Sequence, residues 1–309
     1  MVQVYKVNDS FNFSLFENAS CAFGVFDGVH QGHQYLLQCA QETARICGGL
    51  SIALTFDIDP DEVFHADRLK KLMSNEERLK ALSESGVDAV VALEFNREFA
   101  ALSPMDFLEK TFNGHIPAFL HVGLDFHFGA FAKGSVAELG EWGARVGTHI
   151  NAHNLKALGS RPITATRIRN LLAEHALAEA KELLGKPYIL TGNVVKGRGE
   201  GGDMGFKTAN IVTPPNRQVL SEGVYSAYVY VDGKKYKAAV SVGVSPVFED
   251  RTNATCEAHI LDFSGDIYGD EIAVEFVEYL RPMIKFESTE ELIRTVMGNI
   301  EYVRNTLKL

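Results

Sequence analysis

Strand and helix signals alternate through the first half of the chain, and this alternation constrains the fold more than any other feature. Short apolar runs that favour strands occur at CAFGVFDG, LSIALTFDIDP, VDAVVALEF and PAFLHVGLDF. Between them lie helix signals, including a capping-box pattern at Ser74 and Glu77 and Pro104 in a first turn. This order predicts a parallel sheet with helices on both faces. Ligands bind such sheets at the carboxyl ends of strands, so the loops after Gly24, Phe56 and Gly123 are expected to bind the ligand.

The pattern changes near residue 187. LAEHALAEAKELLGKP has helical spacing, and Gly185 and Pro187 are expected to end that helix. Strand-like segments follow, broken by Asp-Gly, Ser-Gly-Asp and Tyr-Gly-Asp turns, until a last helix in STEELIRTVMGNIEYVRNTL. The sequence therefore predicts two domains, residues 1–186 and 187–309, the second a closed or sandwich β domain with a C-terminal helix.

Charge and cysteine content exclude several classes of protein. The 309 residues include 30 Lys and Arg against 40 Asp and Glu, a net charge of −10. An acidic chain without a long basic run is a poor candidate for binding nucleic acid. Four cysteines without a C-x-x-C pair fit a reducing compartment. No apolar run is long enough to span a bilayer, and MVQVYKVNDS lacks the apolar part of a signal peptide, so we expect a cytoplasmic protein without a membrane partner.

Two histidines in GVFDGVHQGHQYLL follow a strand at the point where a helix begins. Gly28 and Gly32 let a ligand approach the backbone closely. The helix N-terminus offers free N–H groups, and His30 and His33, one turn apart, can both donate to one anion. This combination predicts a phosphate site. Capping, packing or metal ligation are the alternatives, although no third metal ligand stands at a motif spacing.

A second segment, PITATRIRNLL, is expected to enter a helix late in the first domain. Thr164 and Thr166 can cap that helix, while Arg167 and Arg169 bring positive charge to its start. Because arginine near a helix N-terminus opposes the dipole, an anionic partner is expected, and a triphosphate would supply one. The alternative is that both arginines lie on a solvated face.

GRGEGGDMGFKTAN, which begins at Gly197, contains G-x-G-x-x-G and nearly spells a Walker A loop. Both of those motifs need a helix next, but IVTPPN follows, and Phe206 replaces a Walker A glycine. Thr208 and Asn210 lie two residues apart on an extended segment and therefore face the same way. Their oxygens are hard ligands suited to Mg²⁺ beside phosphates. Ordinary turn chemistry is the alternative for both.

Several segments together resemble one family. H-x-G-H after a strand and the later I-[ST]-x-T-x-x-R segment are similar to the nucleotidyltransferase superfamily. More narrowly, GVFDGVHQGHQ, TFDIDP, FNREFAALSPMDFL, GLDFHFG and ITATRIR resemble, in order, the bacterial bifunctional riboflavin kinase/FAD synthetase family, and MGFKTANI and later blocks resemble its kinase module. The resemblance covers nearly the whole chain. It implies a Rossmann-like nucleotidyltransferase domain with a parallel sheet, followed by a Greek-key β-barrel riboflavin kinase domain.

For the first domain, the resemblance implies that FMN phosphate attacks the α-phosphorus of ATP and that pyrophosphate leaves with magnesium. His30 and His33 would hold the ATP phosphates and stabilise the transition state. Phe56 and Asp57 fall in the block that lines the flavin side. The remaining residues implied to contact ATP are Gly24, Asp27, Gly32, Asp125, Thr164, Thr166, Arg167 and Arg169.

For the second domain, the resemblance implies that Glu257 is the catalytic base, which takes a proton from the ribityl hydroxyl of riboflavin as that hydroxyl attacks the γ-phosphate. Thr208 and Asn210 would bind Mg²⁺, with Thr208 also at ATP. The glycines from Gly197 to Gly205 would form a flap whose amides approach the nucleotide. Strand alternation alone, in ATCEAHILDF, favours a solvent-facing Glu257 without a catalytic role.

The chain departs from the family pattern at four places. Thr164-Ala165-Thr166 stands where Ser-Ser-Thr is usual, which removes one hydroxyl. Asp59 replaces a common His, and His127 replaces Arg or Thr. Lys207 replaces the proline before Thr-Ala-Asn, so the backbone there is less constrained.

These observations favour an enzyme that phosphorylates riboflavin to FMN and then adenylylates FMN to FAD, with ATP, riboflavin and FMN as small-molecule substrates and Mg²⁺ as cofactor. One alternative is a monofunctional FMN adenylyltransferase whose β domain only binds flavin. A flavin-binding regulator without activity would need neither His30 and His33 nor Glu257. A pantetheine-phosphate or cytidylyl transferase would share H-x-G-H but would not explain residues 188–309.

Overall fold

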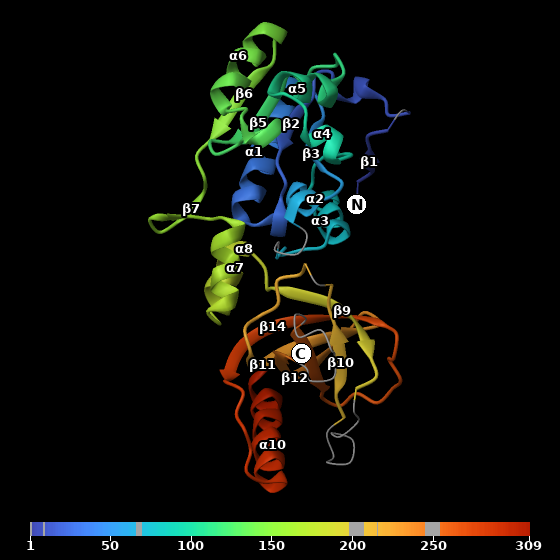
Figure 1. The fold of residues 1–309 in the computed structure, drawn as a ribbon, viewed down its shortest axis with the longest axis vertical. Helices are drawn as coiled ribbons and strands as arrows, with labels where there is room; N and C mark the ends of the chain where they lie inside the picture. Colours follow the sequence, from blue (N-terminus) through green and yellow to red (C-terminus); the bar gives the residue numbers. More distant parts are fainter. Residues whose placement is uncertain (1, 9, 66–69, 198–206, 215, 245–253) are drawn as a thin grey trace. The chain divides into compact units, whose positions relative to one another are not determined.

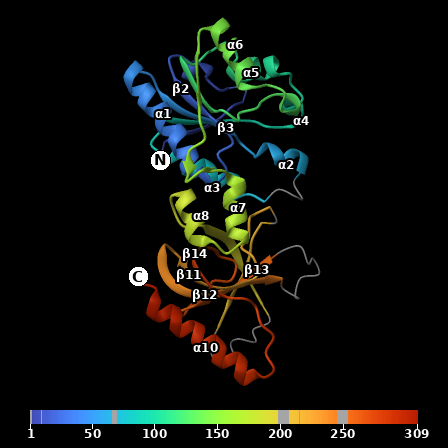
Figure 2. The same ribbon diagram turned by 90° about the vertical axis from the view of Figure 1, so that its left-hand side faces the viewer.

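A computed structural model describes residues 2–8, 10–65, 70–197, 207–214, 216–244 and 254–309. The chain forms two compact units, Met1–Ala165 and Thr166–Leu309. The first is an α/β unit and the second contains a β-barrel (Figures 1 and 2).

The first unit is built on a six-stranded, fully parallel sheet in the order β1-β4-β3-β2-β5-β6. This architecture confirms the predicted parallel sheet. The strands are β1 (Val4–Lys6), β2 (Ser20–Phe23), β3 (Ser51–Phe56), β4 (Ala89–Leu93), β5 (Phe119–Gly123) and β6 (His149–His153). A small hairpin, β7 (Ala157–Leu158) and β8 (Arg161–Pro162), follows the sheet.

Helices cover both faces of the sheet, and strand alternation decides which residues each face receives. Cys21 and Phe23 of β2 pack with one apolar cluster and Ala22 packs with the other. The first cluster is closed by α5 and α6, and the second by α1 and α3. The helices are α1 (Gln31–Cys47), α2 (Pro60–His65), α3 (Asn75–Ser83), α4 (Arg97–Ala100), α5 (Pro104–Phe112) and α6 (Val136–Val146).

The predicted helix signals act as expected. The Ser74 hydroxyl accepts from the Glu77 amide and the Glu77 carboxylate accepts from the Ser74 amide, a complete capping box for α3. Pro104 is in the first turn of α5, and Gly48 ends α1 in the left-handed conformation.

The second unit begins one residue into α7 (Ala165–Ala173) and includes α8 (Leu177–Leu184). It continues as a closed barrel in the order β10-β13-β12-β11-β14-β9. All described barrel pairings are antiparallel, and they confirm the predicted β-barrel with a C-terminal helix, α10 (Thr289–Thr306). The strands are β9 (Ile189–Val195), β10 (Ala209–Val212), β11 (Gly223–Val231), β12 (Lys234–Val244), β13 (Ala254–Ile260) and β14 (Glu271–Arg281).

One sequence expectation is wrong: residues 172–187 are not a single helix. α7 ends at Ala173, and α8 begins only at Leu177. Between them His175 adopts a left-handed conformation (φ 60°), which a helix cannot contain. Its ring stacks on Tyr279 at 3.9 Å and its Nδ1 lies 2.8 Å from the Tyr225 hydroxyl, so contacts with the barrel hold the break.

Candidate active sites

The sheet order reverses at β2, which lies between β3 and β5. In open α/β sheets, the crevice beside such a switch point is where ligands bind. The loop that follows β2 carries backbone strain: Phe26 has φ 62° and the β-branched Val29 has φ 42°, although both side chains are buried. Strain of this kind is concentrated at functional sites.

His30 and His33 meet at the end of this strained loop. His30 is the N-cap of α1, and its Nδ1 accepts from the His33 amide at 3.3 Å. The two rings stack with centroids 3.6 Å apart and an angle of 16° between planes. His30 is buried, and its Nδ1 acts as an acceptor, so the ring hydrogen of the neutral form lies on Nε2.

His33 is held in its neutral form. Burial is the main cause that lowers the pKa of His33 well below its ordinary value, and the charges of His30 and Arg78 lower that pKa further. Its Nδ1 is buried and has no hydrogen-bond partner among the described residues. A neutral imidazole at the start of a helix can donate one hydrogen bond to an anion.

Other predicted residues of the phosphate loop have structural contacts. The Asp27 carboxylate accepts from the backbone amides of Leu72 and Met73 at 2.9 and 3.3 Å, so it fixes the segment before α3. Gly24 is the first residue after β2, and its amide donates to Leu54.

Gly32 brings the two predicted phosphate segments together. A Cβ atom on Gly32 would lie 3.1 Å from the His30 ring and 3.5 Å from the carbonyl oxygen of Ile163. The backbone directly before Thr164 therefore lies against the start of α1. The sequence predicts that both segments bind one ligand, but it does not predict that they contact each other.

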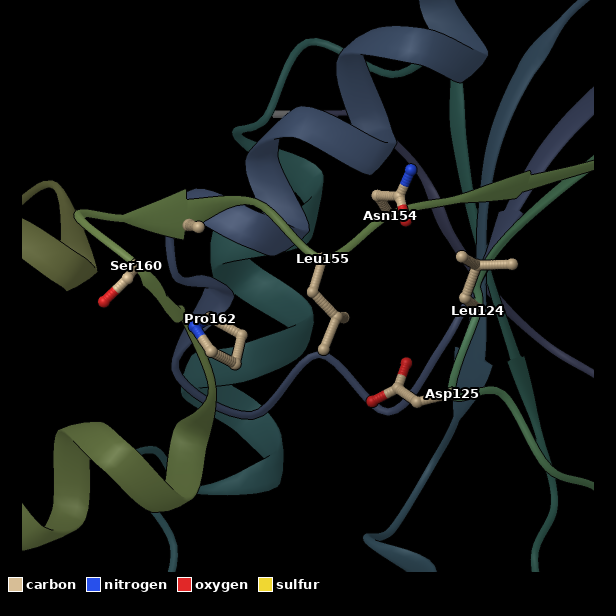
Figure 3. A pocket seen from close by; sticks show the side chains of 7 residues that line it. Leu124, Asp125, Asn154, Leu155, Ser160 and Pro162 are labelled. Atoms are coloured by element: carbon tan, nitrogen blue, oxygen red, sulfur yellow. The ribbon is translucent and has the colours of Figure 1, made fainter.

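Asp125 lines a pocket of about 430 Å³ at the carboxyl ends of β5 and β6. Figure 3 shows Leu124 and Asp125 on one side of it and Leu155 and Pro162 on the other. Asp125 Oδ1 lies over Gly123, where an added Cβ would come within 2.6 Å of it. Pro162 lines the pocket, and the carbonyl group of the next residue, Ile163, lies beside Gly32 in the first turn of α1. The pocket is therefore close to the start of α1.

The later predicted ATP contacts fall at the start of α7, which begins at Ala165. Thr164 precedes the first helical residue, and Thr166 is already in the first turn. The Arg169 guanidinium donates to the Thr166 hydroxyl at 3.0 Å, while Arg167 is half-buried. The helix thus has two arginines in its first two turns, as the sequence predicts.

Phe56 and Asp57, predicted for the flavin side, lie at the end of β3. Phe56 is buried and its ring packs against Phe23 and Phe95. Asp57 Oδ1 accepts from the amides of Ile58 and Phe95 at 2.8 and 2.9 Å, which ties the loops after β3 and β4 together.

In the barrel, Asn210 and Glu257 are directly opposite each other on the antiparallel pair β10 and β13. The side chains of such a pair point to the same face. Ala209 and Cys256, next to them, are buried inside the barrel, so Asn210 and Glu257 lie on its outer face, and Glu257 is exposed. Two predicted kinase residues thus share one face of the barrel, and Thr208 directly precedes β10.

Of the glycine flap between Gly197 and Gly205, only Gly197 is among the described residues. Gly197 lies against Asn210, since an added Cβ would come within 2.7 Å of Asn210 Cγ. Gly205 lies outside the described residues. Lys207 is exposed, and its carbonyl oxygen accepts from His259 Nδ1 at 2.8 Å. The outer face of β13 thus holds the backbone just before Thr208.

The sequence analysis did not predict two polar features near the first site, the pair His121 and His153 and the buried Arg78. His121 Nδ1 lies 2.9 Å from His153 Nε2, and burial, followed by the charge of His153, lowers the pKa of His121 to about 4. The spacing of these histidines gives no motif. Arg78 is buried beneath the loops after β2 and β3. It is four residues before Leu82 and shares the buried face of α3, a spacing that is visible in the sequence.

Comparisons with known proteins match both units. A family model for FAD synthetase matches residues 13–167, and one for riboflavin kinase matches residues 184–307. The chain is 32% identical over 278 residues to the bifunctional riboflavin kinase/FMN adenylyltransferase of Listeria monocytogenes, covering 89% of this chain and 88% of that protein. Its identity to the Escherichia coli K12 protein of that name is 36% over 280 residues, again covering 89% and 88%.

A crystal structure with the same architecture is known. It is named as a macrolide-efflux protein from Streptococcus pneumoniae and superposes with a TM-score of 0.85, with 28% identity, over 98% of this chain and 99% of that one. In the part of the chain that the structure describes, no helix has the length and apolar character needed to cross a membrane.

Fold and comparisons together define a nucleotidyltransferase unit followed by a flavokinase barrel. The chain belongs to the bifunctional riboflavin kinase/FMN adenylyltransferase family. The family models leave residues 168–183 between them, and these residues form most of α7 and α8. The functional boundary at residues 186 and 187 stays a prediction.

Proposed function

We propose that the two activities of the family reside in separate sites of this chain, with FMN adenylylation in the first unit and riboflavin phosphorylation on the barrel. The observation that carries the proposal is the assembly of residues distant in sequence into two polar groups. His30, His33 and the Ile163 carbonyl meet at the start of α1, and Asn210, Glu257 and Gly197 meet on the barrel.

In the first unit, the ATP phosphates would lie at the N-terminus of α1. His30 and His33 would donate hydrogen bonds to the phosphate oxygens as FMN phosphate attacks the α-phosphorus, and both would stabilise the charge that develops there. The pocket at Asp125 would take the nucleoside end of ATP, because it lies next to the phosphate segment through Pro162 and Ile163. Thr164, Thr166, Arg167 and Arg169 would contact the triphosphate, with Phe56 and Asp57 on the flavin side.

On the barrel, Glu257 would accept the proton of the ribityl hydroxyl as that hydroxyl attacks the γ-phosphate of ATP. An exposed carboxylate on the outer face is accessible to such a substrate. Thr208 and Asn210 supply oxygen donors, and these fit a magnesium ion, which would neutralise phosphate charge when bound with ATP. Gly197 and Gly205 would lie in the flap over the nucleotide.

A product assay tests the proposal. Purified protein is incubated with riboflavin, ATP and Mg²⁺, and FMN and FAD are separated by chromatography. We expect FMN first and FAD later. If neither forms, the proposal is wrong; FAD from supplied FMN but none from riboflavin would indicate a monofunctional adenylyltransferase. The match of the riboflavin kinase family model to residues 184–307 favours an enzyme with both activities.

We further propose that the enzyme acts in the cytoplasm on these small molecules and not on nucleic acid. The net charge of −10 and the free thiols of all four cysteines support this proposal.

A further inference from the structure

Arg78 is a buried arginine that the proposed reaction does not use. It lies on α3 and is 2% exposed. Fully buried arginines are rare because a charged side chain loses its hydration on burial. The role of Arg78 must therefore be sought in the groups that its guanidinium contacts.

The guanidinium joins the ends of two strands. Nη1 donates to the carbonyl oxygen of Val25 at 3.1 Å and to the Thr55 hydroxyl at 2.8 Å. Nη2 donates to the carbonyl oxygen of Phe56 at 2.8 Å, with Asp57 O at 3.4 Å and Asn75 Oδ1 at 3.2 Å also in reach. One side chain thus fixes the loop after β2, which leads to His30, against the end of β3.

All five of these acceptors are neutral oxygens, and among the described residues no carboxylate forms an ion pair with Arg78. Burial lowers the pKa of Arg78, whereas the charges of Asp59, Asp27, Glu62 and Asp57 raise it, in that order. Asn75 also donates to Glu62, which pairs with the buried Lys71.

The charge of Arg78 reaches the candidate site. Of the charged groups that lower the pKa of His33, one is His30 and the other is Arg78. A fixed positive charge in a poorly solvated region acts over several ångströms, and it favours an anion at the same place.

We propose that Arg78 is a positioning residue of the adenylyltransferase site, which holds the loop between β2 and α1 in its strained form and adds positive potential where the ATP phosphates bind. The proposal rests on the proposed function of that site. Arg78 does not touch the substrate; it acts through the loop backbone and through His33.

The test compares two variants. Arg78→Met removes the charge and all the hydrogen bonds, whereas Arg78→Lys keeps the charge but cannot donate from two nitrogen atoms as the guanidinium does. Lys80→Met is the matched control, because Lys80 is exposed on the same helix. For Arg78→Met we expect kcat/KM for ATP in FMN adenylylation to fall by about tenfold or more, as for loss of charged hydrogen bonds. Arg78→Lys should recover part of that loss, and Lys80→Met should match the wild type.

Two readouts separate positioning from general damage. Riboflavin kinase activity of the same preparations should stay within about twofold of wild type if the mutation acts on one site only. The pKa of His33, followed by NMR of labelled histidine, should rise in Arg78→Met and stay near the wild-type value in Arg78→Lys, since only the former loses the charge.

Unchanged adenylylation and an unchanged pKa of His33 in Arg78→Met would overturn the inference. If Arg78→Met does not fold, Thr55→Val is the alternative test, because it removes one acceptor of the Arg78 guanidinium and keeps the charge. Adenylylation equal to that of the wild type in Thr55→Val would again overturn the inference. Wild-type protein that makes no FAD from FMN would instead show that the proposed function has failed, and the inference with it.

Discussion

Gly197 lies where the candidate kinase site leaves no space for a side chain. An alanine there would push the Asn210 side chain aside, since its Cβ would come within 2.7 Å of Asn210 Cγ. We expect Gly197→Ala to reduce kinase turnover by roughly ten- to a hundredfold, the loss that a misplaced ligand causes, and to spare FMN adenylylation. Steady-state assays of both reactions measure this.

Gly298→Ala is the control for that variant, because an added Cβ on α10 meets nothing within 4 Å. It should keep both activities and stabilise the helix by about 0.5 to 1 kcal/mol. Equal kinase activity in the two alanine variants would mean that Asn210 has no role in turnover.

Lys207 occupies the position where proline is usual in the family. Its carbonyl oxygen is already fixed by His259, and a proline carbonyl could accept the same hydrogen bond. Proline would also fix φ and limit the unfolded chain. Lys207→Pro should therefore give equal or higher kinase kcat/KM. A large decrease would show instead that the lysine cation has its own role at the phosphates.

At the scale of elements, α3 shows what local sequence can and cannot predict. Ser74 and Glu77 predict the start of the helix, because a capping box depends on neighbours in the chain alone. The spacing to Leu82 places Arg78 on the buried face of the helix. Its hydrogen-bond acceptors at the ends of β2 and β3 are more than twenty residues away, so the helical pattern does not identify them.

Ser74→Ala removes the hydroxyl that caps α3. We expect it to lower the free energy of unfolding of the first unit by about 1 kcal/mol, the usual effect of losing such a cap. Urea unfolding measures this, with Lys80→Ala on the exposed side of the same helix as control. Identical stability of the two variants would show that the cap does not stabilise the helix.

The same limit explains the break between α7 and α8. Residues 172–187 contain good helix formers, so the sequence favours one helix. Contacts of His175 with Tyr225 and Tyr279, about fifty and a hundred residues later, hold the left-handed residue that breaks it. Local propensity predicted helical structure on both sides but had no information on these partners.

At the scale of the whole molecule, the order of the strands in each unit was not predictable from local pattern. Alternation predicted that Thr208 and Asn210 share a face, whereas the register that sets Asn210 opposite Glu257 exists only in the closed barrel. The family resemblance predicted that Thr208, Asn210 and Glu257 act at one site. The pairing of β10 with β13 gives the physical reason why Asn210 and Glu257 are close together.

Stability of the chain should depend on pH through Asp59. Burial is the main cause that raises the pKa of this carboxyl to about 6 from 3.8. The folded state keeps the proton more tightly than the unfolded state, so stability falls as pH rises from about 4 to about 6, and the loss persists above 6. It amounts to roughly 2 to 3 kcal/mol, at about 1.4 kcal/mol for each pH unit between the two pKa values.

Asp59→Asn removes that loss, and its amide oxygen can still accept from the Asp61 amide. Thermal unfolding should show a smaller difference between pH 4.5 and pH 7 in the variant than in the wild type. Parallel pH dependence in the two proteins would contradict the role of Asp59.

The central claim is that one chain holds two separate sites, and a pair of variants tests it most directly. FMN and FAD formation are measured side by side for His33→Ala and Glu257→Ala, with riboflavin or FMN supplied. We predict that His33→Ala loses FAD formation and keeps FMN formation, and that Glu257→Ala does the reverse. Parallel loss of both products in either folded variant, or unchanged kinase turnover in Glu257→Ala, would contradict the account.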